Sequence, residues 1–269
     1  MKSIKKMMMS GYIFVVCLMM IAAPVAVCAN DDGGLAATVP APRMPLIESV
    51  EDLAALTHLE DYEMELGETI LQRNMVTSQG WAILGNDPEL QMLWLILGNE
   101  LGALCYAYDD MQAIPFGPMN LISLYISKRS GSDYMWPFFK GVTVAQIAAY
   151  EMPEYYERKL NFILFPNWRG WSDEERLTLK FTKALVENRL SDELYQEALE
   201  AWGEKRLLRN TTWVGYINLW SLVAKVSDLT YDPVAEPAPS IPPAAIENLG
   251  AVMEATRMRL LDYFYSLGN

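Results

Sequence analysis

The sequence predicts an all-α protein, a helical bundle that ends in a C-terminal helical arm. Three observations support this fold class. Apolar residues recur at helical spacing along almost the whole chain. No two-residue turn of the kind that closes a β-hairpin separates alternating apolar and polar runs. Helix start signals recur instead, as in Asp87-Pro88 and in the acidic cap that begins at Ser172.

Residues 1–29 are predicted to be a secretory signal peptide. Three lysines form a basic start, an apolar run follows over 12–27, and Val27-Cys28-Ala29 supplies the small residues of a cleavage site. A membrane anchor is the alternative, but the apolar run is short and contains Pro24. We therefore expect an exported protein, periplasmic or secreted, with no membrane attachment after cleavage.

The charge balance is strongly acidic. The formal net charge is −13; residues 1–29 hold three lysines and no acid, so 18 basic and 34 acidic residues remain after cleavage. Because this sign repels nucleic acid and anionic lipid, neither is expected as a partner. Of the three cysteines only Cys105 lies beyond residue 29. No internal disulfide is then possible, and a buried thiol is the favoured interpretation.

The helical domain is predicted over 46–231, after a flexible lead-in at 30–45 that is rich in Asp, Gly, Ala and Pro. Residues 47–57 open the folded part, and a helix is expected over 62–81. The next helix, over 89–107, has Asp87 as its N-cap and Pro88 at its first position. Its core stripe is expected to consist of Leu90, Leu93, Trp94, Leu97, Leu101 and Leu104.

Further helices are expected over 118–128, 134–149, 176–188, 191–201 and 206–227. Residues 232–243 contain five prolines and predict a stiff connector. It leads to an amphipathic helix within 244–269, whose apolar stripe is Ile246, Leu249, Met253, Leu260, Phe264 and Leu267. This stripe could pack on the core of the same chain or on a neighbouring subunit, and the sequence does not distinguish the two.

Four pieces between about Trp81 and Pro233 carry a family resemblance. A Pro-Glu-Leu helix start lies at 88–90, and a Gly-containing loop leads into an aromatic helix start at 129–136. An acidic-capped helix ends in Ala-Leu-Val-Glu-Asn at 184–188 and is followed by 190–194, and Val-Gly-Tyr-Ile-Asn occupies 214–218. In this order they resemble the carboxymuconolactone decarboxylase-like family, which shares its fold with alkylhydroperoxidase D.

The chain departs from that family at its reactive positions. The family's Tyr-Glu-Trp-x-x-His start has Met135 in place of Glu and Phe139 in place of His, and a further family glutamate corresponds to Asn120. The Cys-x-x-Cys motif of the peroxidase members is absent. These changes remove groups that move protons near neutral pH or that reduce peroxide. They also enlarge the apolar wall of a pocket.

The resemblance implies a cavity with an acid-binding and a proton-donating side chain. Arg129 would bind a carboxylate through paired hydrogen bonds, and Tyr134 would supply the proton. The expected substrate-binding residues are Trp136, Phe139, Tyr216 and Asn218. Tyrosine and tryptophan at helical spacing are, however, usually core residues whose polar end is hydrogen bonded. The resemblance further implies a homo-oligomer that uses no cofactor.

Three functions are consistent with these residues. The first is a cofactor-free lyase or isomerase that acts on a small carboxylated or cyclic compound. The second is a catalytically degenerate binding protein for a small apolar ligand. The third is an alkylhydroperoxidase-type antioxidant, against which the missing Cys-x-x-Cys speaks directly.

Other polar residues have simpler interpretations. His58, the single histidine, could act as a base over the pocket, but a surface or capping position is favoured. With one histidine and no His-Glu-x-x-His motif, no metal site is expected. The acidic pairs at 109–110 and 174–175 adjoin helix boundaries, where carboxylates complement a helix end or remain solvated.

Overall fold

The computed structural model describes residues 40–72, 78–106 and 115–232 of the 269-residue chain. In these residues every regular element is helical and no strand occurs, so the all-α prediction is confirmed. The elements are α3 (Val50–Ala54), α4 (Asp61–Gln72), α5 (Gln79–Leu84), α6 (Pro88–Tyr106), α7 (Pro118–Ser130), α8 (Met135–Ala149), α9 (Tyr155–Lys159), the 3-10 helix η2 (Leu160–Phe162), α10 (Asp173–Val186) and α11 (Asp192–Val226).

Three predicted segments lie outside the described residues. They are the signal peptide at 1–29, nearly all of the proline-rich connector at 232–243 and the C-terminal helix within 244–269. The acidic pair at 109–110 and most of the lead-in at 30–45 also lie outside them, and the side chain of Cys105 is not described.

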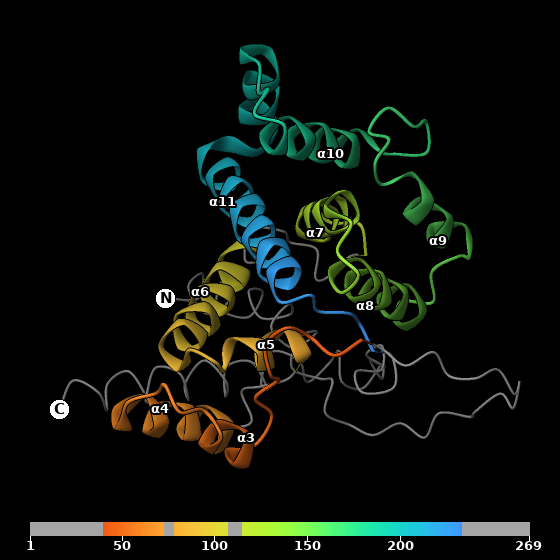
Figure 1. The fold of residues 1–269 in the computed structure, drawn as a ribbon. Helices are drawn as coiled ribbons and strands as arrows, with labels where there is room; N and C mark the ends of the chain where they lie inside the picture. Colours follow the sequence, from red (N-terminus) through yellow and green to blue (C-terminus); the bar gives the residue numbers. More distant parts are fainter. Residues whose placement is uncertain (1–39, 73–77, 107–114, 233–269) are drawn as a thin grey trace, which may run out of the picture.

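Helix α7 is the centre of the bundle. All its residues from Pro118 to Ser127 are buried, and α8, α10 and α11 pack around it (Figure 1). Its buried polar groups are hydrogen bonded, as such groups must be. The Ser123 hydroxyl donates to the Met119 carbonyl, and the Trp213 indole N–H of α11 lies 3.0 Å from Ser123 Oγ. These bonds fix α11 against α7.

The predicted helix starts are confirmed where a local cap encodes them. Asp87 Oδ1 accepts from the Leu90 N–H at 2.9 Å, and Pro88 is the first residue of α6. Ser172 and Glu175 form a reciprocal capping box at the start of α10. Ser49 and Asp52 do the same for α3, a short helix that the sequence pattern did not separate from 47–57.

Two helices have different bounds from those expected. The helix expected over 62–81 corresponds to α4 and the start of α5, and residues 73–77 between them are not described. The two helices expected over 191–201 and 206–227 are the two parts of α11, which lie on either side of a kink. Gly203 breaks the helical backbone inside α11 with φ 69° and ψ 166°, a conformation open to glycine. The break divides α11 close to the predicted boundary.

The predicted core stripe of α6 is wrong at three of its positions. Trp94 and Leu101 are buried as expected, but Leu90, Leu93 and Leu97 are exposed. The buried face instead includes Gln91, whose amide donates to the Trp81 carbonyl at 2.8 Å. Helix α6 is apolar on every side, so its pattern does not mark one face as the core face.

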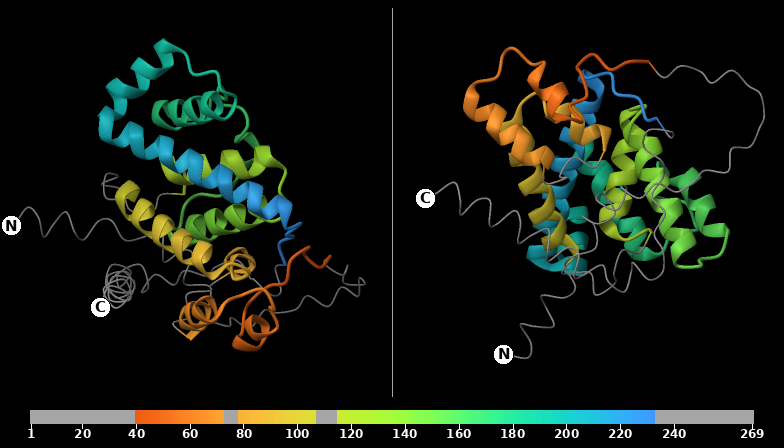
Figure 2. Two further views of the ribbon diagram at one scale, coloured as in Figure 1. Left: turned by 60° about the vertical axis from the view of Figure 1, so that its left-hand side comes forward. Right: turned by 90° about the horizontal axis from the view of Figure 1, so that it is seen from below.

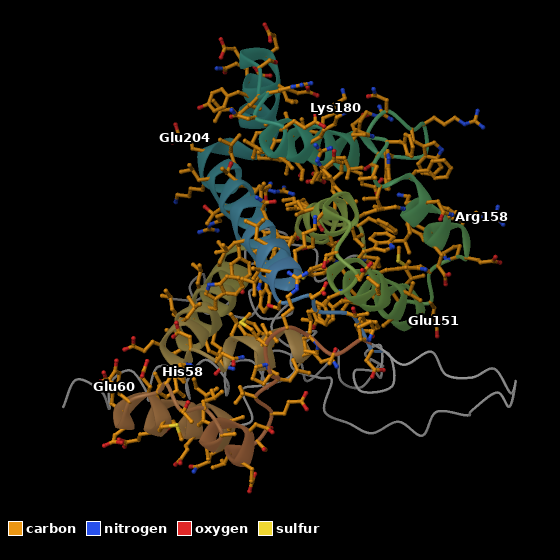
Figure 3. All side chains as sticks on the ribbon, viewed as in Figure 1. His58, Glu60, Glu151, Arg158, Lys180 and Glu204 are labelled. Carbon is orange, nitrogen blue, oxygen red and sulfur yellow. The ribbon has the colours of Figure 1, made fainter. Side chains whose placement is uncertain are left out.

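The charged residues lie mainly on the outside of the bundle. Figure 3 labels six residues spread over the periphery, from His58 and Glu60 near α4 to Glu204 on α11, and five of the six are exposed. Within the described ranges, no helix has both the length and the apolar character needed to cross a bilayer.

Candidate functional site

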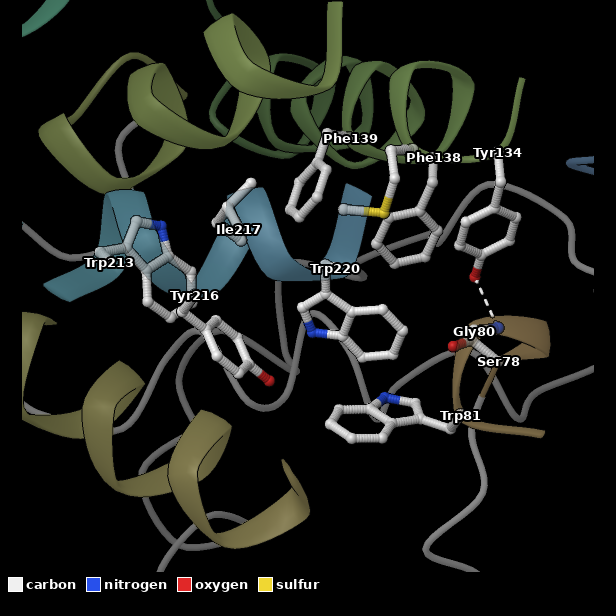
Figure 4. Close-up of a pocket in the computed structure, with 11 residues that line it drawn as sticks. Ser78, Gly80, Trp81, Tyr134, Phe138, Phe139, Trp213, Tyr216, Ile217 and Trp220 are labelled. Carbon is white, nitrogen blue, oxygen red and sulfur yellow. Dashed lines mark hydrogen bonds between the residues drawn. The ribbon is translucent and has the colours of Figure 1, made fainter. Parts of the chain in front are cut away.

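An apolar pocket lies where α5, α8 and α11 meet, beside α6 (Figure 4). It contains about 340 Å³ of space between atoms, part of which is open solvent, and the part open to a water molecule is small. Its lining residues are Ser78, Gly80, Trp81, Tyr134, Met135, Phe138, Phe139, Trp213, Tyr216, Ile217 and Trp220. Ser78 is half-buried and the other ten are buried, so Ser78 is the most exposed residue of the lining. None of these residues carries a charge.

Aromatic rings form most of the pocket wall. Trp220 of α11 meets the rings of Trp81 and Trp94 edge to face, with centroid distances of 5.0 and 4.6 Å. On the α8 side, Tyr134 stacks on Phe138 at 5.7 Å, and Phe138 meets Phe139 edge to face at 5.3 Å. Edge-to-face and offset contacts of this kind add to the stability gained from burial. The wall is therefore closely packed.

Tyr134 connects α8 to the start of α5. The Gly80 N–H donates to the Tyr134 hydroxyl at 3.1 Å (dashed in Figure 4). Gly80 lies in the first turn of α5, where backbone N–H groups have no intrahelical acceptor. The Ser78 N-cap side chain makes no capping bond. Tyr134 therefore provides the acceptor that a helix cap usually provides.

At Gly80, the backbone of α5 lies close to the side chains of Tyr134 and Trp220. A Cβ added at this position would lie 3.1 Å from both the Tyr134 hydroxyl and the Trp220 ring. Any side chain here would push these aromatic groups apart. The absence of a side chain thus sets the width of the pocket at this point.

Tyr216 points its hydroxyl toward α6, where a Cβ added at Gly98 would lie only 2.3 Å from it (Figure 4). Burial raises the pKa of Tyr216 well above its ordinary value, and a hydrogen bond with Trp220 offsets only part of this effect. The phenol therefore stays protonated at neutral pH. It cannot act as a general base there.

The structure brings three of the predicted site residues together. Tyr134, Phe139 and Tyr216 all line the pocket. They come from the end of the α7–α8 loop, from α8 and from α11. Their order around the pocket is visible in Figure 4.

The other three predicted site residues do not line the pocket. Arg129 is 41% exposed and forms an ion pair with Glu187 at 3.0 Å. Trp136 lies half-buried under the Lys128 ammonium, 4.5 Å from its ring centroid. Asn218 is exposed on the outer side of α11. The expected pairing of an acid-binding arginine with Tyr134 is therefore absent from this pocket.

The remaining candidates also lie elsewhere. His58 is exposed, with Nε2 3.0 Å from the Asn86 carbonyl. The acidic pair at 174–175 is structural, because Glu174 pairs with Arg206 and Glu175 with Lys159. In the part of the chain that the structure describes, no group of three His, Cys, Asp or Glu side chains could hold a metal ion.

Several lining residues were not predicted. Trp213, Ile217 and Trp220 share one face of α11, since they are spaced by four and three residues. This spacing around Tyr216 was a usable signal. Gly80 and Trp81 gave none, because they reach the pocket across a sequence separation of 54 residues from Tyr134.

No protein-family model, curated protein or solved structure matches the chain. The site is therefore interpreted from its own geometry.

Proposed function

We propose that the protein binds a small, uncharged, apolar molecule in the pocket between α5, α8 and α11. The observation that carries this proposal is the lining itself, which is aromatic and aliphatic and has no charged side chain. Mostly apolar concave sites with a few polar groups are typical of small-molecule binding. Its polar groups are the hydroxyls of Ser78, Tyr134 and Tyr216 and the indole N–H groups.

The size of the pocket limits the ligand. An apolar cavity of about 150 Å³ holds one benzene-sized molecule. The 340 Å³ between atoms here includes open solvent, and the part that a water molecule can enter is much smaller than such a cavity. A compound with one ring, or an aliphatic chain of similar volume, is therefore the largest expected class, and its entry requires that wall side chains such as the stacked rings of Tyr134 and Phe138 move.

A lyase or isomerase of the carboxymuconolactone decarboxylase-like kind is the second proposal. It rests on the resemblance of 88–218 to that family, and it would place Tyr134 as proton donor. It requires a site for the substrate's carboxylate, and Arg129 lies outside the pocket, in a pair with Glu187. Binding without turnover is therefore the function that the geometry favours. Export through residues 1–29 and a homo-oligomeric state belong to the same proposal.

Tryptophan fluorescence tests the binding proposal. Three indoles line the pocket, so small aromatic and aliphatic compounds should change the emission in a saturable way. Ser78→Phe should abolish this response, because it adds a ring at the most exposed residue of the lining and removes no capping hydrogen bond. Glu197→Phe places the same ring on the exposed part of α11 before Gly203 and should leave the titration unchanged. A response that survives Ser78→Phe would refute the pocket as the binding site.

A further inference from the structure

Two rows of exposed apolar residues lie on the outer surface of α6 and α11. The row on α6 consists of Leu90, Leu93 and Leu97, and the row on α11 of Leu208, Leu219, Leu222 and Val226. Leu93 and Leu222 are each 58% exposed, and Val226 is 63% exposed. Scattered exposed leucines are ordinary, but rows at helical spacing mark an interaction surface.

The two rows lie on the same side of the helix pair. Trp94 contacts both Tyr216 and Trp220, and Gly98, four residues later, lies beside Tyr216. Rising numbers on α6 thus meet falling numbers on α11, which makes the helices antiparallel neighbours (Figure 2). In each helix, a rotation about the axis in the direction of increasing residue number leads from the exposed row to the face that contacts the other helix, by about a quarter turn. For antiparallel helices this geometry directs both rows to one outer surface.

This outer surface is also uncharged. Residues 211–224 of α11 and 90–99 of α6 contain no Asp, Glu, Lys or Arg, although the chain has 34 acidic and 21 basic residues. A helix face that meets water usually carries such residues. Gly215 lies in the α11 row, and a Cβ added there would have no atom of the described residues within 4 Å. The row therefore has room for close approach of another backbone.

The same chain contains an apolar stripe of matching length. A helix over 244–267 would be about 36 Å long, and the α11 row from Leu208 to Val226 spans about 27 Å. The described chain ends at Asp232, soon after Val226, where the Tyr231 N–H donates to the Asp133 carbonyl. Residues 233–243 can span about 34 Å when extended. The segment can therefore reach either end of the row.

We propose that residues 244–267 of the same chain form a helix that docks on this outer surface of α6 and α11. The surface consists of the seven exposed leucine and valine residues of the two rows. It would bury the apolar stripe that begins at Ile246. The docking requires no second subunit. It is independent of ligand binding in the pocket.

Hydrogen exchange of the full chain tests this docking. Amides of 246–267 should exchange at least about tenfold more slowly than in an unstructured peptide, equally at low and high protein concentration. Gly215→Trp and, independently, Leu222→Glu should remove this protection, while peptides of α7 keep theirs. Glu197→Trp is the matched control, because it adds the same bulk to α11 before Gly203, and it should change neither region.

Three results would overturn the proposal. The first is exchange of 246–267 at the unstructured rate in the unmodified chain. The second is protection that both Gly215→Trp and Leu222→Glu leave intact, which would place the helix elsewhere. The third is protection that rises with concentration together with a dimer mass in light scattering, which would assign the surface to a second copy.

Discussion

At the residue scale, Tyr134 stabilises the fold in a way that a proton donor would not need to. Its hydroxyl accepts the Gly80 N–H in the first turn of α5, and its ring stacks on Phe138. A proton donor of the lyase type would need that hydroxyl to be available to a substrate. Removal of the Tyr134 hydroxyl therefore distinguishes a binding protein, in which it affects stability, from a lyase, in which it affects turnover.

Tyr134→Phe should lower the free energy of unfolding by about 1–3 kcal/mol, because it leaves a buried N–H without an acceptor. Binding of an apolar compound should persist in this variant. Tyr195→Phe removes an exposed hydroxyl of α11 and should change stability little. Chemical denaturation of both variants provides the comparison. A loss of turnover in Tyr134→Phe without a loss of stability would instead support the enzyme.

We expect substitution by alanine to affect stability differently at Gly98 and at Gly215. Gly98→Ala should destabilise the protein by about 1–3 kcal/mol, since its Cβ would lie 2.3 Å from the buried Tyr216 hydroxyl. Gly215→Ala should not destabilise it, because alanine favours helix over glycine by about 0.5–1 kcal/mol and no atom of the described residues lies within 4 Å of an added Cβ. Adding Tyr216→Phe to Gly98→Ala should recover most of the loss. Additive effects in this double-mutant cycle would contradict the close contact.

Three of the six residues that the sequence assigned to the site line the pocket. Tyr134, Phe139 and Tyr216 were found because they lie in recognisable local segments. Arg129 was assigned to the cavity because it begins the loop that the resemblance emphasised, but its side chain points to Glu187 instead. Gly80 was missed because a contact across 54 residues leaves no trace in local spacing.

At the element scale, Lys159 joins α9 to the start of α10. Its ammonium lies 2.6 and 2.8 Å from the two carboxylate oxygens of Glu175. The rings of Phe116, Tyr156 and Trp171 surround it at 5.1–5.3 Å. Glu175 also accepts the Ser172 N–H of the capping box, so one carboxylate holds both the helix start and the lysine.

Lys159→Met should destabilise the protein by about 2–4 kcal/mol, because it leaves the largely buried Glu175 carboxylate without its counter-charge. The double variant Lys159→Met/Glu175→Gln should be more stable than Lys159→Met alone. Arg129→Met is the control, and its half-exposed pair should contribute less than about 1 kcal/mol. Thermal unfolding of the three variants checks the order. Equal losses for Lys159→Met and Arg129→Met would show that burial does not distinguish the two pairs.

Helix starts were more predictable than helix faces. A cap such as Asp87 or Ser172 acts on amides within three residues, so the sequence alone contains it. The face of α6 depends on which neighbours cover an all-round apolar helix, and its pattern assigned Leu90, Leu93 and Leu97 to the core wrongly. The exposed leucines that resulted are the basis of the proposed docking surface.

At the scale of the whole molecule, the charge of the chain contrasts with the absence of charge in the pocket lining. The chain is acidic overall, with a formal net charge of −13, yet the pocket lining has no charged side chain. An acidic surface repels anions at a distance, and an uncharged wall offers a carboxylate no counter-charge once it is close. Both properties favour a neutral ligand. The homo-oligomer and the family membership stay predictions.

Native mass spectrometry of the purified full chain tests the central claim most directly, followed by denaturation and identification of any released compound. We expect a neutral apolar molecule, bound at one per chain, retained in Arg129→Ala and lost in Ser78→Phe. A bound carboxylated compound whose retention depends on Arg129 would contradict it. That result would instead support a lyase or isomerase.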